Sequence, residues 1–141
     1  MTKIVLAAID LEDTDGAAKV AAAASRYAAA EGATLHAVNV IPDSGMSLVG
    51  SYLSKDHFKQ MLDKVHDGFQ VWAEDHLPEA TEKHLHVVQG TVYDKIIGTA
   101  RDLGAHTIVI GAHRPEFRDY LVGPNAARVV RHADQTVLVV R

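Results

Sequence analysis

The chain has 141 residues, of which 48% are hydrophobic, and this size predicts a single domain over residues 1–141 with one well-buried core. The formal net charge is -4 with scattered signs, so no basic stripe favours a nucleic acid partner. The absence of cysteine excludes disulfides and thiol chemistry, and with no apolar leader at the start it predicts a cytoplasmic location.

The first half of the chain predicts two strands separated by a helix. Residues 3–10 are almost continuously apolar, as in a strand buried on both faces of a parallel sheet. An alanine-rich helix is predicted over about 14–31, with Gly32 at the position of a helix-ending glycine. Residues 33–40 alternate and are rich in β-formers, which predicts a second strand that is broken by Pro42.

The second half repeats this alternation. Apolar residues at helical spacing from Phe58 onward predict a long helix that ends before Pro78. The later elements predicted are a strand over 83–90, a helix over 92–103, a strand over 106–111, a helix over 125–132 and a strand over 136–140. This order predicts an α/β fold: a single open parallel five-stranded sheet with helices on both faces.

Ligands of such a sheet bind beyond the carboxyl ends of the strands. Asp10 follows the first predicted strand, and Gly111 closes the fourth. The segment after Gly111 is bounded by a second glycine, Gly123, and leads into a helix that Pro124 or Asn125 opens. A helix start of this kind attracts anions, but glycine and proline are also ordinary turn residues, so a phosphate site and a plain turn both remain open.

The nine histidines raise the question of a metal site. His84 and His86 alternate on a predicted strand, and other histidines lie among helical charges. No ligand set is completed at convincing spacing, so no metal site is predicted and the histidines are interpreted as surface or capping residues.

At these positions the chain resembles the universal stress protein family, and the resemblance covers nearly the whole sequence. The residues that carry it are Asp10, Gly90, Gly111, Arg114, Gly123, the helix from Arg128 to Ala133, and residues 136–140. In the ATP-binding branch of that family the loop reads Gly-x-x-Gly, a spacer, and then Gly-Ser or Gly-Thr. Here Arg114 replaces the middle glycine, the spacer is shorter, and Pro124 replaces the hydroxyl residue.

The resemblance implies that ATP is bound and acts as a regulatory switch in the stress response, with no catalysis beyond slow hydrolysis. Magnesium is expected with it, because phosphate sites without a protein cage take Mg²⁺ through the phosphates, and Asp10, Glu12 and Asp13 are candidates for an outer carboxylate. The implied binding residues are Ala8, Asp10, Val40, Gly111, His113, Arg114, Gly123, Pro124, Asn125 and Ala126. Adenosine is expected at Asp10 and the Val40 backbone, ribose at Gly111 and His113, and the phosphates at the helix start.

Two questions stay open at this level. Arg114 either contacts a phosphate or fills the cleft and excludes the triphosphate. The alternative to a nucleotide switch is a family member that binds no nucleotide and acts only through dimerisation. In both cases the apolar strand over 136–140 predicts a homodimer, or a higher oligomer, through its open edge. A membrane transporter is one candidate partner that the family resemblance suggests.

Two other classes of protein do not fit the predicted loops. A phosphoacceptor receiver domain needs an aspartate after the third strand and a lysine after the fifth, and Gln89 and Arg141 do not supply them. A dinucleotide-dependent oxidoreductase needs a glycine-rich turn after the first strand, and the segment from Asp10 to Asp13 has no glycine.

Overall fold

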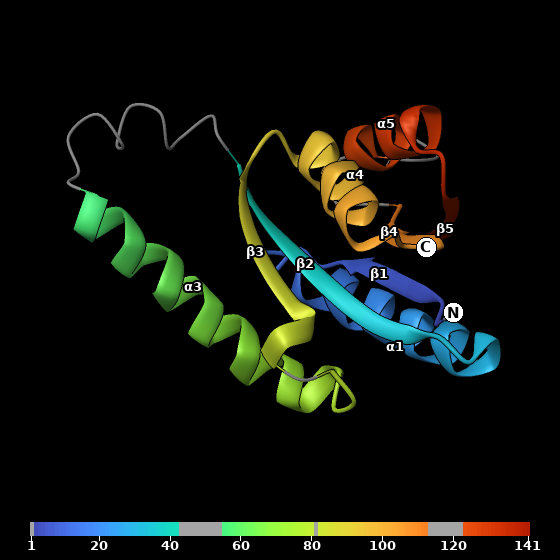
Figure 1. Ribbon diagram of the computed structural model, residues 1–141, viewed down its shortest axis with the longest axis horizontal. Coiled ribbons are helices and arrows are strands. Elements are labelled where there is room, and N and C mark those ends of the chain that lie inside the picture. The colour runs from blue at the N-terminus through green and yellow to red at the C-terminus, as the bar shows by residue number, and fades with distance from the viewer. Residues whose placement is uncertain (1, 43–54, 81, 113–122) are drawn as a thin grey trace.

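Strands and helices alternate along the chain as the sequence predicts (Figure 1). The computed structural model describes residues 2–42, 55–80, 82–112 and 123–141. Its elements are β1 (Ile4–Ala8), α1 (Thr14–Glu31), β2 (Thr34–Pro42), α3 (Lys55–His76), the 3-10 turn η2 (Glu82–His84), β3 (Leu85–Gly90), α4 (Val92–Leu103), β4 (Thr107–Gly111), α5 (Pro124–His132) and β5 (Thr136–Val140).

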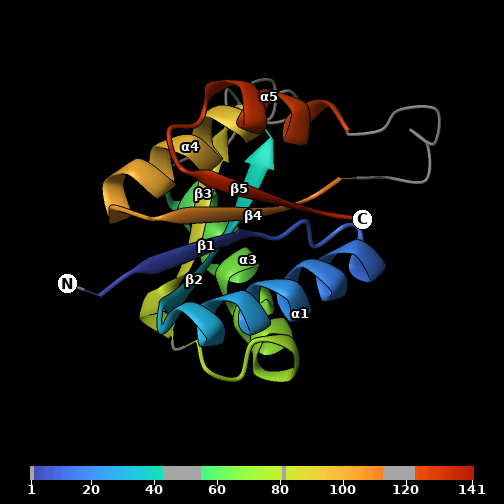
Figure 2. The same ribbon diagram turned by 90° about the vertical axis from the view of Figure 1, so that its right-hand side faces the viewer.

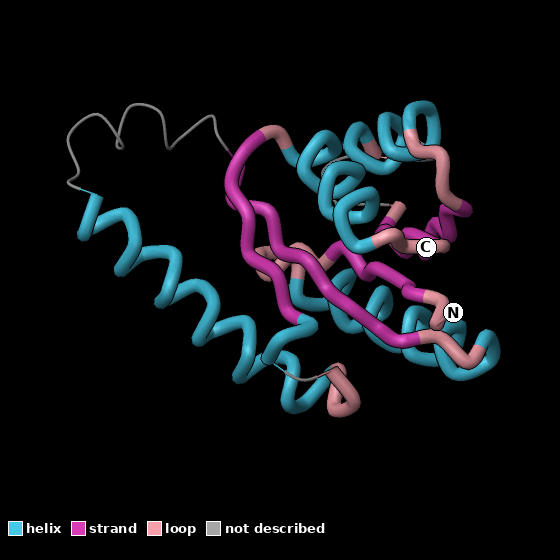
Figure 3. The backbone as a smooth tube through the Cα atoms, in the orientation of Figure 1, coloured by secondary structure: helices cyan, strands magenta, loops and turns pink. Residues whose placement is uncertain are grey.

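The five strands form one parallel sheet in the order β3-β2-β1-β4-β5. The chain therefore runs outward from β1 to β3, returns to the middle of the sheet, and runs outward again through β4 and β5. Helices α4 and α5 cover one face, and α1 covers the other with α3 beside it (Figure 2). The strands twist against one another along the sheet (Figure 3). The predicted fold class is confirmed.

Two apolar clusters hold the layers together, one on each face of the sheet. The first joins β1, β2 and β4 to α1 and α3, with Phe69 of α3 fully buried in it. The second joins the opposite faces of the same strands to α4 and α5, with Leu6 and Val129 fully buried. Alternate residues of β1 and β2 belong to opposite clusters, which is why these central strands are apolar almost throughout.

The ends of α1 follow from local chemistry. Asp13 is its N-cap, and the side-chain Oδ1 accepts the backbone N–H of Gly16 at 3.2 Å. A Cβ at Gly16 would collide with the Asp13 carboxylate, so the glycine makes room for the cap. Gly32 ends the helix with φ 62°, a left-handed conformation that favours glycine.

The predicted bounds of α1, α4 and β5 are confirmed, whereas the other elements differ from their predicted bounds by one to three residues. β1 ends at Ala8, so Asp10 lies two residues beyond it. β2 continues to Pro42 instead of ending at Val40. A proline can occupy the last position of a strand, where its missing N–H removes no further ladder bond. The expected start of the third strand forms η2 instead.

Helix α3 is the longest helix in the described part of the chain and the one least enclosed by it. Phe69 and Ala73 are its buried residues, whereas Phe58 and Trp72, on the same predicted apolar stripe, are half-buried. Neither α3 nor any other helix in the described ranges has the length and apolar character that crossing a membrane requires.

Candidate functional site

The carboxyl edge of the sheet brings together the residues that the sequence predicts as a site. Strand order reverses between β1 and β4, because β1 leads through α1 to β2 on one side, whereas β4 leads through α5 to β5 on the other. Figure 2 shows α1 and α5 both beginning at this edge, near the C-terminus. This is the switch point at which open α/β sheets bind their ligands.

The β1 exit is a tight turn built on Asp10. Its Oδ1 accepts the backbone N–H of Glu12 at 3.0 Å, and its carbonyl accepts the N–H of Asp13 at 3.1 Å. Asp10 is exposed, and Ala8 before it is half-buried at the end of β1. The carboxylate therefore orders its own loop, as aspartate often does in turns, and is presented at the edge of the sheet.

Asn39 of β2 is a residue that sequence reasoning missed. Its buried side-chain amide Nδ2 donates to the carbonyl of Ile9 at 2.9 Å, while the Ile9 N–H donates to the Val38 carbonyl at 2.8 Å. These bonds hold the β1 exit against β2. The sequence did contain a signal that could have identified Asn39: a polar side chain inside a largely apolar strand.

Val40 lies two residues beyond the last residue that pairs β2 with β1. That ladder ends at Ala8 and Val38, whereas on its other side Val40 pairs with Val88 of β3. The backbone of Val40 thus lies next to the β1 exit, where the resemblance expects adenosine.

The β4 exit and the start of α5 are tied together directly. The N–H of Gly123 donates to the carbonyl of Ala112, and a Cβ at Gly123 would come within 3.1 Å of that oxygen. A side chain at Gly123 would therefore crowd the Ala112 carbonyl, and the Gly123 N–H is used inside the protein. That N–H is not available to a phosphate, although the resemblance places Gly123 among the binding residues.

The first turn of α5 supplies the groups that remain for an anion. The N-cap residue, Gly123, has no side chain with which to cap the helix, and Pro124 at its first position has no N–H. The N–H groups of Asn125 and Ala126 fall in the first turn, where a helix leaves its donors without intrahelical partners. Pro124 and Asn125 are exposed, whereas the Ala126 side chain is buried, so Ala126 can offer only its backbone.

His113 and Arg114 lie outside the described residues, as does the rest of the segment up to residue 122. Of the ten predicted binding residues, the other eight are described, and all lie at or next to the carboxyl edge. Both interpretations of Arg114 stay predictions.

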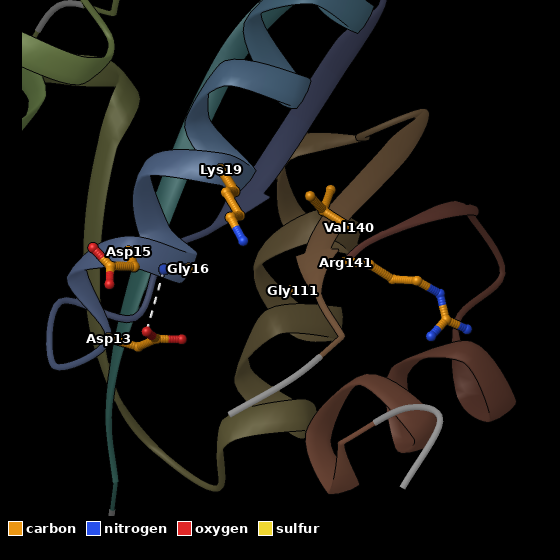
Figure 4. A pocket seen from close by; sticks show the side chains of 7 residues that line it. All are labelled: Asp13, Asp15, Gly16, Lys19, Gly111, Val140 and Arg141. Carbon is orange, nitrogen blue, oxygen red and sulfur yellow. Dashed lines mark hydrogen bonds between the residues drawn. The ribbon is translucent and has the colours of Figure 1, made fainter. Parts of the chain in front are cut away.

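A cavity of about 220 Å³ opens at the same edge on the α1 side of the sheet (Figure 4). Gly111 belongs to it, and the other lining residues apart from Asp13 were missed by sequence reasoning. The lining residues are Asp13, Asp15, Gly16, Lys19, Gly111, Val140 and Arg141. Figure 4 shows Arg141 directed away from Lys19. Only the strand order, which puts β5 next to β4, brings the end of the chain to the start of α1.

The acidic residues after β1 do not form a metal centre by themselves. Asp13, expected as an outer carboxylate for magnesium, is the N-cap of α1. Within the described ranges, no group of three or more histidines, aspartates or glutamates is placed to hold a metal ion. A cation at this edge would have to be held mainly by a ligand's own phosphates.

Comparison with known proteins agrees with this architecture. Universal stress protein G of Shigella flexneri is 29% identical over 149 aligned positions that cover all of both chains. Universal stress protein UspA from Lactobacillus plantarum has the same fold, with a TM-score of 0.72 at 23% identity, over 99% of this chain and 97% of that one. A universal stress protein solved in complex with cAMP gives a TM-score of 0.66 at 19% identity, over 99% and 97%. The universal stress protein family matches residues 1–141, and the chain therefore belongs to it.

Proposed function

We propose that this protein binds ATP at the carboxyl edge of the sheet and acts as a nucleotide-dependent regulator without rapid turnover. The observation that carries the proposal is the meeting of three features: the ordered Asp10 turn, the β4 exit at Gly111, and the uncapped first turn of α5. A carboxylate can recognise an adenosine hydroxyl or amine, and the helix start attracts phosphate.

Family membership supports a role in the stress response. One structural relative was solved with cAMP, and this supports an adenine nucleotide as the ligand class for the present chain. The described residues offer few protein ligands for a metal, so Mg²⁺ is proposed to arrive with the triphosphate. The regulated partner is proposed to be another protein in the cytoplasm, with a transporter as one candidate.

Calorimetric titration with ATP, with and without EDTA, tests binding and the role of magnesium. Arg114→Ala decides the role of the arginine. If Arg114 contacts a phosphate, the change weakens ATP binding by about 1.5 to 3 kcal/mol, the range for hydrogen bonds to charged groups, and leaves adenosine almost unchanged. Arg101→Ala is the control, because Arg101 is exposed in the last turn of α4. That turn lies at the end of α4 that points away from the carboxyl edge of the sheet.

Two results would redirect the proposal. Stronger ATP binding by Arg114→Ala would mean that the arginine fills the cleft. If neither the wild type nor Arg114→Ala binds ATP at millimolar concentration, the nucleotide proposal is wrong. Equal affinity with and without EDTA would exclude only the role of magnesium.

The second candidate is an interaction protein that acts through dimerisation without a nucleotide. Two observations favour it: Pro124 removes a donor from the helix start, and β5 is an edge strand whose four valine and leucine residues are half-buried. We propose the homodimer through β5 under both candidates, because an open apolar edge favours pairing with a second copy.

A further inference from the structure

Three histidines lie together where β3 begins, and one of them is about 50 positions away from the other two in the sequence. His36 belongs to β2, His84 to η2 and His86 to β3. His36 Nδ1 and His86 Nε2 are 2.9 Å apart, and the ring centroids of His36 and His84 are 4.6 Å apart. His36 is 9% exposed, which corrects its interpretation as a surface residue.

The His36 and His86 rings lie nearly in one plane and meet end to end. Their planes differ by 13°, their centroids are 5.2 Å apart, and their nitrogens are closer than the separation of two stacked rings allows. One nitrogen therefore carries a hydrogen and donates it to the other. Because the two nitrogens point at each other, they do not converge on a shared metal ion.

This hydrogen bond has a chemical limit. A neutral pair can form it, and a pair with one extra proton can still form it, because one facing nitrogen keeps its lone pair. When both rings are protonated, both facing nitrogens carry hydrogen, and two like charges stand at hydrogen-bond distance. The contact then becomes repulsive.

Among the described side chains, no acidic group is buried beside the two rings to offset such charges. His36 and His86 alternate with residues of the α1-side cluster, so they point to the α4 side of the sheet. The charged residues of α4 are Asp94, Lys95, Arg101 and Asp102, and all are exposed, whereas its one tyrosine, Tyr93, is half-buried. Lys83 of η2 is exposed, β1 contributes only apolar residues, and α3 contributes the half-buried His66, while its other ionisable residues are exposed.

We propose that His36, His84 and His86 form an acid-sensitive latch that holds η2 and the edge strand β3 on β2 at neutral pH and loosens as His36 and His86 take up protons. Burial, with His84 and His86 nearby, lowers the pKa of His36 to about 4. Burial also lowers the pKa of His86, with help from His84 and His66. The neutral forms of His36 and His86 are thus favoured while β3 is paired with β2.

The direction of the pH effect follows from linkage. The open state, with an ordinary histidine pKa of 6.5, binds more protons than the closed state between pH 6.5 and about 4, so opening becomes easier as pH falls through this window. His36 alone makes opening about tenfold more favourable at about pH 5.5 than at about pH 7.5.

Hydrogen exchange of the full chain, corrected for intrinsic rates, tests the latch at these two pH values. Peptides that cover η2 and β3 are expected to lose protection about tenfold in acid, while α1 changes little. His36→Gln keeps a polar side chain but does not titrate, so it should reduce the difference to the part that His86 still contributes. His132→Gln should retain it, because His132 is exposed on α5.

Equal loss of protection in α1 and β3, or an unchanged pH effect in His36→Gln, would overturn the latch. Circular dichroism at neutral pH checks that His36→Gln folds. If it does not, NMR titration of the wild-type histidines decides: a midpoint for His36 far below 6.5 supports the latch, and an ordinary midpoint refutes it.

Discussion

Asn39 is the residue that most directly sets the geometry of the β1 exit. It is 8% exposed, and its amide spans from β2 to the Ile9 carbonyl, immediately before Asp10. A buried polar group is stable only when it is hydrogen-bonded, so this amide and this carbonyl depend on each other. The position of Asp10 at the carboxyl edge therefore rests on a neighbouring strand as well as on its own turn.

Asn39→Ala should destabilise the protein by about 1 to 3 kcal/mol, because it takes the amide donor away from the buried carbonyl of Ile9. Urea denaturation measures the change. Asn125→Ala is the control: Asn125 is exposed and should leave stability nearly unchanged. If the two variants unfold at the same urea concentration, the Asn39 hydrogen bond does not contribute to stability.

At the scale of an element, α4 shows how helix positions differ in their need for glycine. Gly98 lies inside the helix, and a Cβ there would meet no atom within 4 Å. Gly104 ends the helix with φ 69°, a conformation that costs free energy for any residue with a Cβ. Gly98 is therefore replaceable, and Gly104 is tied to the helix end.

Gly98→Ala should raise the free energy of unfolding by about 0.5 to 1 kcal/mol, because alanine loses less conformational freedom in a helix. Gly104→Ala, the same chemical change in a left-handed conformation, should lower it by about 1 kcal/mol. Thermal unfolding of both variants gives the signs. A lower melting temperature for Gly98→Ala would mean that the helix surroundings there are tighter than the structure indicates.

For the whole molecule, the open side of β5 decides the proposed assembly. The Ala112 N–H donates to the Val140 carbonyl at 2.7 Å, so Val140, and with it Leu138, turns its backbone groups toward β4. Val137 and Val139 alternate with them, and their N–H groups point to the outer edge. Leu138 also packs against the α1-side cluster, so substituting its side chain would disturb the core as well.

Val139→Pro should therefore convert the dimer into a monomer, because it removes an outward N–H while sparing the bonds to β4. Val139→Thr keeps the N–H and the branched side chain and should remain dimeric. Sedimentation velocity at micromolar concentration distinguishes the two states. A wild-type monomer, or a dimer that survives Val139→Pro, would exclude pairing through this edge.

Much of the fold can be predicted from the sequence, because the signals are local. The bounds of α1 and α4 follow from apolar spacing and the ending glycines, Gly32 and Gly104. The position of Asp10 after β1 and of Gly111 at the end of β4 follows from where apolar runs stop. Those local patterns are sufficient to place candidate site residues at one edge of a parallel sheet.

Other features depend on which strands become neighbours, and this is decided by long-range packing. The order β3-β2-β1-β4-β5 places Asn39 beside Ile9, and the register between β2 and β3 places His36 beside His86. No short-range signal links residues 50 positions apart. By itself, the sequence determined the alternation of elements and the composition of the carboxyl edge. Only the tertiary structure decided that the histidines meet and that Gly123 serves the β4 exit, because both contacts arise when separate segments pack together.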